Sequence, residues 1–377
     1  MSEWKEVKLG EICSYGKERI GVASLTSATY ISTENMQPNR GGVVLASSIP
    51  DKGCVVAYKK DDVLVSNIRP YFKKIWQASH DGGCSADVLV FRNRENVNAK
   101  FLYYLLSADS FFDYSMATAK GTKMPRGDKN SLMEYGVKLP PLAEQRRIAS
   151  ILGSLDDKIE LNNAITKNLE EQAQALFKNW FVDFAPFGGN MPAGWKRGKL
   201  SDIAKFEKEK IEVSRLTEFS YYSTENMLPD KAGVCPASSL PNVSQTTRCY
   251  PGETIVSNIR PYFKKVYFCT EELAGCSTDV LCFKPRKASL AIYNYCSLCQ
   301  DDFFYYVLNG AKGTKMPRGD KSQMMKFAVC IPPEEVLQKF AAMVAPMLQK
   351  VDGNRNENRC LAVLRNALLP KLVNGTA

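Results

Sequence analysis

The sequence has one histidine, no long apolar run and no organised set of cysteines. His80 aligns with residues 270–272 of the second half, where no histidine occurs, so we interpret it as a surface turn residue rather than a catalytic base. The twelve cysteines include one CxxC pair, Cys296 and Cys299, without the second pair or nearby histidine that a zinc site needs. We therefore expect no metal site, and reduced thiols in a cytoplasmic protein.

Other signatures are absent as well. No apolar stretch approaches the roughly 20 residues that span a bilayer, and the N-terminus lacks the apolar region of a signal peptide, so no membrane partner is expected. GAKGTK, from Gly310 to Lys315, lacks the spacing of a phosphate-binding loop, and neither GxGxxG nor an Asn-Pro-Pro-aromatic motif occurs. We also find no paired acid-x-lysine that would hold a nuclease metal. The sequence therefore predicts no catalytic residue.

What the chain does have is length and positive charge. Its 377 residues suffice for two or more domains with full cores. Fifty lysines and arginines against forty acids give a formal net charge of +10, which favours a polyanionic partner.

The sequence consists of two tandem copies of one unit. VSNIRPYFKK (Val65–Lys74) recurs unchanged at Val256–Lys265, and AKGTKMPRGDK (Ala119–Lys129) recurs unchanged at Ala311–Lys321. The offset is 191 residues early in the unit and 192 later, so a single insertion separates the copies. A solenoid needs three or more short repeats, so two long copies predict a pseudo-two-fold assembly instead.

Each unit ends in a stretch with apolar residues spaced alternately four and three apart, which is the pattern of a coiled-coil helix. We expect the two helices to pair antiparallel, with the globular parts at opposite ends. Asn162 matches Asn354, and a polar residue in such a seam fixes the register. Pro346 should kink the second helix and Pro370 should end it. The residues expected to pair the helices are Leu152, Leu155, Ile159, Asn162, Leu169, Leu176, Val344, Val351, Asn354, Leu361 and Leu368. The alternative is two unrelated amphipathic surface helices.

Within the first unit, Val63–Ile68 and Asp87–Phe91 read as strands, and Gly41–Gly42 and Gly82–Gly83 as turns. Phe101–Tyr114 reads as one helix. Its expected core face consists of Phe101, Leu102, Leu105, Leu106 and Phe112. The predicted class is α+β, with two tandem-repeated mixed α/β domains separated by two long antiparallel helices. The predicted division is 1–141 and 186–333 for the domains, and 142–185 and 334–377 for the helices.

The two unchanged motifs are basic and aromatic, which suits DNA. Lysine and arginine neutralise phosphates, and Asn, Thr and Arg read base edges. The candidate DNA contacts of the first unit are Asn35, Asn67, Arg69, Tyr71, Lys73, Lys74, Lys120, Thr122, Lys123 and Arg126, and those of the second are Asn226, Asn258, Arg260, Tyr262, Lys264, Lys265, Lys312, Thr314, Lys315 and Arg318. Gly121 and Gly127 would let the backbone approach a DNA strand. The alternatives are solvated basic loops, and turn-forming roles for Asn35 and Asn67.

The motifs resemble those of the specificity (S) subunits of type I restriction–modification systems. The resemblance rests on the Trp-Lys-x-x-Lys-Leu opening of each half, SNIRPYFKK, GTKMPRGDK, and the run from Leu139 to Phe184. The resemblance covers nearly the whole chain and implies two target recognition domains, each reading half of a bipartite DNA site.

The resemblance further implies that the helices dock two methyltransferase (M) subunits and that nuclease/translocase (R) subunits join the complex. S-adenosylmethionine, ATP and magnesium would belong to those partners, so the chain itself would be a non-catalytic, DNA-binding subunit without a cofactor. Alternatives are a specificity subunit for methylation only and a self-contained nuclease or methyltransferase. Similar readers related by a two-fold axis further predict a near-palindromic site.

Overall fold

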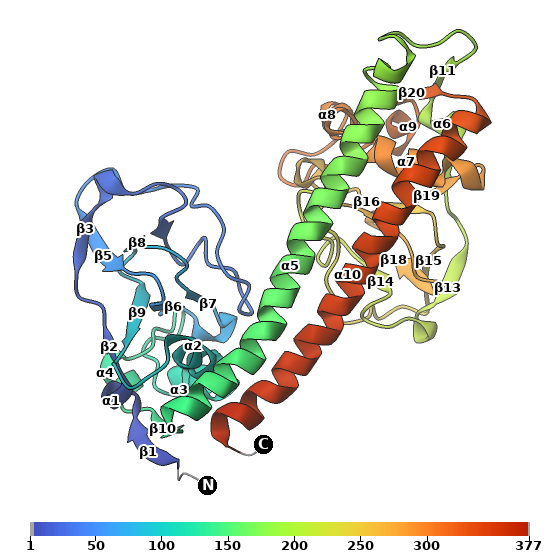
Figure 1. Cartoon of the computed structure of the whole chain (residues 1–377). Coiled ribbons are helices and arrows are strands. Elements are labelled where there is room, and N and C mark those ends of the chain that lie inside the picture. Colours follow the sequence, from blue (N-terminus) through green and yellow to red (C-terminus); the bar gives the residue numbers. More distant parts are fainter. Residues whose placement is uncertain (1–3, 376–377) are drawn as a thin grey trace. The chain divides into compact units, whose positions relative to one another are not determined.

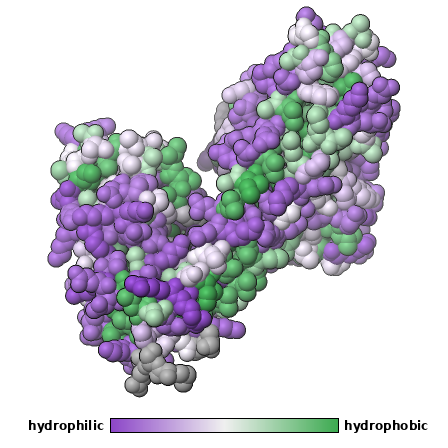
Figure 2. All heavy atoms as spheres, viewed as in Figure 1, coloured by the Kyte–Doolittle hydropathy of each residue, from purple (hydrophilic) through white to green (hydrophobic). Residues whose placement is uncertain are grey.

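A computed structural model describes residues 4–375, which divide into two compact units. Of the described residues, the first unit comprises 4–160 with 357–375, and the second comprises Leu161–Asn356. Each unit thus contains one globular part and half of each long helix, whereas the sequence-based division treats the helices as separate segments. Figure 2 shows a surface on which hydrophilic residues predominate, with smaller hydrophobic patches between them.

The first globular part contains two four-stranded sheets and a two-stranded ribbon. The sheets have the orders β2-β9-β6-β7, which is antiparallel, and β3-β5-β8-β4, in which β4 and β8 are parallel; β1 pairs with β10. The elements are β1 (Lys5–Lys8), α1 (Leu9–Ile12), β2 (Cys13–Tyr15), β3 (Arg19–Gly21), η1 (Val22–Ser24), β4 (Tyr30–Ile31), β5 (Cys54–Tyr58), β6 (Val63–Ser66), η2 (Pro70–Phe72), β7 (Ile75–Gln77), β8 (Gly82–Cys84), β9 (Val88–Asn93), α2 (Ala99–Ser107), α3 (Asp109–Ala117), α4 (Lys129–Met133) and β10 (Gly136–Leu139).

The second globular part repeats this topology, with sheets β12-β19-β16-β17 and β13-β15-β18-β14 and the ribbon β11-β20. Its elements are β11 (Lys196–Lys199), α6 (Leu200–Ile203), β12 (Ala204–Phe206), β13 (Lys210–Glu212), η4 (Val213–Arg215), β14 (Tyr221–Tyr222), β15 (Gln245–Cys249), β16 (Thr254–Ser257), η5 (Pro261–Phe263), β17 (Val266–Phe268), β18 (Ala274–Cys276), β19 (Val280–Pro285), η6 (Ala288–Leu290), α7 (Ala291–Leu298), α8 (Asp301–Asn309), α9 (Lys321–Met324) and β20 (Ala328–Ile331). The repeat read from the sequence is therefore a repeat of folds.

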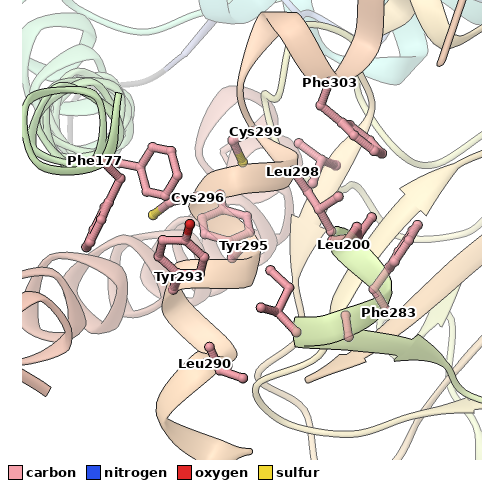
Figure 3. Packing of buried hydrophobic residues seen from close by; sticks show 14 of the residues in the cluster. Phe177, Leu200, Phe283, Leu290, Tyr293, Tyr295, Cys296, Leu298, Cys299 and Phe303 are labelled. Carbon is pink, nitrogen blue, oxygen red and sulfur yellow. The ribbon is translucent and has the colours of Figure 1, made fainter. Parts of the chain in front are cut away.

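The core of the second unit lies around α7, which packs between the long helix and the sheet. Figure 3 shows Phe177 of α5 on one side of α7 and Phe283 of β19 on the other. The Phe177 and Tyr293 rings have centroids 5.4 Å apart. This packing joins the globular part to its stretch of long helix in one apolar cluster.

The long helices are α5 (Leu142–Phe181) and α10 (Glu334–Asn374), and they lie side by side within each unit (Figure 1). In the first unit Arg365 pairs with Asp156 at 2.7 Å and Glu357 with Lys158 at 3.4 Å, so the helices run antiparallel. All the predicted pairing residues are buried or half-buried. The predicted class, α+β with repeated domains and long antiparallel helices, is confirmed.

The prediction that Pro370 ends the second helix is wrong, because α10 continues to Asn374. Pro346 also lies inside the helix. Both proline rings are on the exposed face. A proline removes one backbone hydrogen bond, while the packed face, with Leu369 and Leu372 both 6% exposed, continues beyond it.

Two further expectations need correction. The predicted helix Phe101–Tyr114 is two helices, since Ala108 has extended backbone angles and α3 begins at Asp109. Gly82 and Gly83 lie in strand β8 rather than in a turn. A side chain at Gly82 would collide with the Thr29 carbonyl and the Tyr58 ring, so close approach explains the glycine.

The other local predictions hold. Strands β6 and β9 overlap the predicted ones, and all five expected core residues of the 101–114 stretch are at most 4% exposed. Gly42 has a φ of +76°, and its carbonyl accepts from the Gln37 N–H at 2.8 Å, which forms the expected turn.

Candidate nucleic-acid interface

The two unchanged motifs meet in space in the first unit. One runs from the end of β6 through η2 to β7, and the other connects α3 to α4. The Arg69 N–H donates to the Pro125 carbonyl at 2.8 Å, and the Gly127 N–H donates to the Asn67 carbonyl at 3.2 Å. Main-chain bonds therefore hold two basic loops, distant in sequence, against each other.

A third segment completes the site. The turn after the sequence STENM (Ser32–Met36) places Asn39 and Arg40 in left-handed conformations, with φ of 54° and 62°. Their N–H groups donate to the carbonyls of Phe72 and Lys73, at 2.8 and 2.9 Å. The motif VSNIRPYFKK, which we call the basic motif, is thus held from two sides.

The second unit reproduces these bonds. Arg260 N–H to Pro317 carbonyl is 2.8 Å, and Gly319 N–H to Asn258 carbonyl is 3.3 Å. Asp230 and Lys231 donate to Phe263 and Lys264 at 2.8 and 3.0 Å. The same three segments therefore build the same site in both units, and we call these surfaces site 1 and site 2.

Both sites expose large apolar side chains beside cations. Tyr71 is 48% exposed, Phe72 38% and Met124 45%, and their counterparts in site 2 are similarly exposed. The predicted polar contacts that are exposed are Lys120, Thr122, Lys123 and Arg126 in site 1, and Lys312, Thr314, Lys315 and Arg318 in site 2. Aromatic faces stack on bases and cations attract phosphates, so the combination suits nucleic acid.

The cations of site 1 divide into paired and unpaired groups. Lys120 pairs with Asp128, whose pKa falls to about 2 mainly through the Lys120 hydrogen bond, and Arg126 lies 3.2 Å from Asp87. Arg69 and Lys123 have no ion pair within the described chain.

The corresponding pairs in site 2 are Lys312 with Asp320 at 3.2 Å and Arg318 with Asp279 at 3.1 Å. Their unpaired equivalents in residues 4–375 are Arg260 and Lys315. Lys123 and Lys315 are exposed, whereas Arg69 and Arg260 are half-buried. Because none of the four is engaged by an acid of the described chain, they are the cations best able to meet a phosphate.

Lys74 and Lys265 are anchors rather than projecting contacts. Each ammonium donates to a main-chain carbonyl at 2.6 Å, that of Thr33 or Thr224. Burial lowers the pKa of both lysines. They fasten the STEN segment to the basic motif, so they are not free to extend toward DNA as predicted.

Asn35 and Asn226 likewise have structural roles. Asn35 is 4% exposed; its oxygen accepts from the Ser32 N–H, and its amide donates to the carbonyls of Tyr30 and Val44. Asn226 makes the equivalent bonds. With these groups engaged, neither side chain can read a base, and the turn-forming alternative describes them.

Asn67 and Asn258 are also buried, at 7% and 8% exposure, under the loops that they join. A Cβ on Gly127 would lie 2.9 Å from the Asn67 Oδ1, so this glycine permits close packing rather than approach of a DNA strand. Gly121 is exposed and has a φ of +91°, which suits a tight loop.

Sequence reasoning missed the acid that aligns the basic motif. Asp109 accepts from Lys73 at 2.6 Å and from Arg40 at 2.5 Å, and these hydrogen bonds lower its pKa. Asp301 receives Lys231 and Lys264 in the same way, at 2.7 and 3.0 Å. The signal was available, since these acids occupy equivalent positions of the repeat.

In residues 4–375 no group of three or more His, Cys, Asp or Glu side chains is arranged to hold a metal ion. Over the same residues, no helix combines the length and hydropathy that crossing a bilayer requires.

Comparison with known proteins shows what the chain is similar to. The model of the type I restriction modification DNA specificity domain matches residues 1–171. The HindI specificity subunit of Haemophilus influenzae is 24% identical over 100% of both chains, and the MjaIX specificity subunit of Methanocaldococcus jannaschii is 28% identical over 76% of this chain and 71% of its own.

The solved S subunit of a type I system from M. genitalium has the same fold, with a TM-score of 0.63 and 16% identity over 98% of this chain and 96% of that one. Residues 1–171 match the domain model, the second unit repeats the first, and the HindI relative aligns along the whole length. Residues 1–171 therefore match the DNA specificity domain of type I restriction–modification systems, and the chain as a whole is similar to specificity subunits of type I restriction enzymes.

Proposed function

We propose that this chain is the DNA-recognition subunit of a type I restriction–modification complex, in which site 1 and site 2 each read one half of a bipartite sequence. One observation carries the proposal: three segments converge in the same way in both units and leave an unpaired arginine and lysine beside exposed aromatic rings. Two equivalent surfaces in one chain suit two half-sites.

The contacts divide by chemistry. Arg69, Lys123, Arg260 and Lys315 would bind phosphates, which fixes the register of the protein on the duplex. Thr122 and Thr314, on the exposed loops, would face base edges or sugars. Tyr71 and Tyr262 would pack on the sugar-phosphate chain or on an unstacked base.

The paired helices α5 and α10 would dock two methyltransferase subunits, and nuclease/translocase subunits would join that complex in the cytoplasm. S-adenosylmethionine, ATP and magnesium would act on those partners. The chain's own part is to select the sequence and present an adenine to a methyltransferase. Support comes from the relatives, which are specificity subunits of restriction enzymes.

Methylation mapping tests the proposal directly. Genomic DNA from cells with and without the gene should differ by methylation at one bipartite motif, which disappears on deletion and returns on complementation. Identical methylomes would contradict a role in an active modification complex. Cleavage or methylation of DNA by the purified chain alone would favour the rival, a self-contained enzyme.

A further inference from the structure

One arginine of α10 lies directly against site 2. A Cβ built on Gly233 would lie 2.8 Å from the Nη2 of Arg355 and 3.0 Å from its Cζ. Gly233 belongs to the turn whose Asp230 and Lys231 N–H groups bind the basic motif. The guanidinium thus touches the turn that holds site 2 in place.

The same guanidinium contacts two other elements. Its Nη2 donates to Glu170 of α5 at 2.7 Å, and its Cζ lies 5.7 Å from the ring centroid of Tyr267. Tyr267 lies in β17, the strand that begins immediately after the basic motif. The two charged side chains are only 19% and 22% exposed, so water screens the pair weakly. Arg355 therefore links both long helices to the turn of site 2 and to the strand that follows its basic motif.

Site 1 is attached differently. Gly42, the equivalent of Gly233, also has a positive φ, +76°, but a Cβ there would meet no atom within 4 Å. The repeat aligns Arg355 with Asn163, which cannot supply a charged planar fork. The equivalent helices α2 and α7 contact the long helix in both units, and in the first unit the Tyr104 hydroxyl of α2 donates to Asp156 at 2.7 Å.

We propose that Arg355 is a positioning residue that fixes the reading surface of site 2 relative to the long-helix segment of its own unit, acting through Gly233 and Tyr267. The inference rests on the proposed function. A planar guanidinium with three partners in fixed directions holds the turn more rigidly than apolar contact alone. Without Arg355, site 2 keeps the same contacts with bases and phosphates, but its surface can tilt relative to the long-helix segment of its unit.

The test measures geometry rather than affinity alone. The full-length chain is titrated with duplexes that carry the mapped sequence. The spacer, which is the number of base pairs between the two half-sites, is either natural or one base pair longer or shorter. In Arg355→Ala the preference for the natural spacer should fall by about tenfold, because a small misplacement of a binding group is costly. The salt dependence of binding should stay the same, because no phosphate contact is lost.

Two glycine variants make a matched comparison. Gly233→Ala and Gly42→Ala impose similar backbone strain, but only the first pushes against Arg355. Gly233→Ala should relax spacer preference and Gly42→Ala should not, which keeps the inference testable if Arg355→Ala does not fold. Arg147→Ala, on an exposed pair of α5, controls for removal of a helical charge.

The outcomes separate the two claims. Equal affinity of the wild-type chain for the mapped and a scrambled duplex would overturn the proposed function itself. A selective wild type, with unchanged spacer preference in Arg355→Ala and Gly233→Ala, would overturn only the positioning role. A uniform loss of affinity at all spacers, together with a lower melting temperature, would also overturn it and indicate simple destabilisation.

Discussion

The main-chain N–H of Arg69 donates to the carbonyl of Pro125 over 2.8 Å, and the same bond of the same length joins Arg260 to Pro317. Both arginines have a φ of 50°, in the left-handed region. A non-glycine residue there costs free energy and persists where surrounding bonds hold it, often at a functional site. Repetition of this strained junction in both units indicates that the loop geometry matters to function.

Removal of an unpaired cation should weaken DNA binding through electrostatics. Arg69→Ala or Lys123→Ala should lower the affinity for the cognate duplex and reduce the slope of log K against log salt by about one. Fluorescence titrations from low to physiological salt would measure both. Lys138→Ala, an exposed lysine of β10, should change neither. An unaltered slope in both site variants would remove these residues from the interface.

Removal of an acid from site 1 should also weaken DNA binding, although a more positive site would by charge alone be expected to bind a polyanion more tightly. Asp109→Asn makes the site more positive, yet it releases Lys73 and Arg40 from their hydrogen bonds. We expect a loss of about 1 kcal/mol, roughly fivefold in Kd. Asp113→Asn, exposed on the same helix, should tighten binding slightly or leave it unchanged. Tighter binding by Asp109→Asn would mean that alignment of the motif is unimportant.

The two half-sites should resemble each other in inverted order. The loops of site 1 and site 2 share sequence and hydrogen bonds, whereas the exposed Val44 and Leu45 are replaced by Cys235 and Pro236. Protein symmetry is mirrored in the DNA sequence that is read. Methylation mapping should therefore give halves that are identical or differ at one or two positions. Unrelated halves would show that a few divergent loop residues decide specificity.

Replacement of the buried amide in the helix seam should stabilise the chain. Asn354 is fully buried, and its Oδ1 has no hydrogen bond with the described residues. Its amide donates to the Asn162 carbonyl and to the Thr166 hydroxyl, each at a long 3.4 Å. Asn354→Leu should raise the free energy of unfolding by about 1–2 kcal/mol, since a buried unsatisfied group is removed. Chemical unfolding with exposed Gln349→Leu as the control would measure this. A decrease would show that the amide is a net stabilising contact.

Stability of the second unit should depend on pH through Glu207. Burial acts to raise its pKa, but hydrogen bonds from the Glu209 and Lys208 N–H groups and from Lys284 lower it to about 2. A depressed pKa adds stability above the unfolded value of about 4.5, and this contribution is lost as pH falls toward 2. Glu207→Gln should therefore cost about 2 kcal/mol at pH 7 and almost nothing at pH 2.

Chemical unfolding across this pH range, with exposed Glu212→Gln as the control, would test the dependence. A difference between wild type and Glu207→Gln that does not change with pH would refute the assignment.

The repeat, the fold class and the long helices could be predicted from sequence because they rest on long periodic signals. The seam spacing continues for about 40 residues, so single exceptions such as Pro370 do not obscure it. The prediction at Pro370 considered only the backbone hydrogen bond that a proline removes. Packing of Leu369 and Leu372 on the opposite face outweighs that loss, so the helix continues.

The composition of the site was less predictable, because a lysine or asparagine has the same letter whether it projects or anchors. Lys74 and Asn35 lie in motifs that build the site, yet their side-chain N–H groups donate to main-chain carbonyls and so are not available to DNA. Thr33, the partner of Lys74, comes close only on folding, whereas Asn35 bonds to Tyr30 and Ser32 within its own turn. Asp109 was missed for the same reason: its role depends on Arg40, which approaches from the turn after STENM.

The distribution of cysteines offers a way to observe the protein at work. Cys54, Cys235 and Cys360 are exposed, Cys330 is half-buried, and the remaining thiols are buried. Cys54 belongs to the first globular part and Cys235 lies in site 2, beside Asn226. With Cys360 replaced by serine, a maleimide dye pair on these native thiols would report by energy transfer how the separation of the two parts changes when DNA enters.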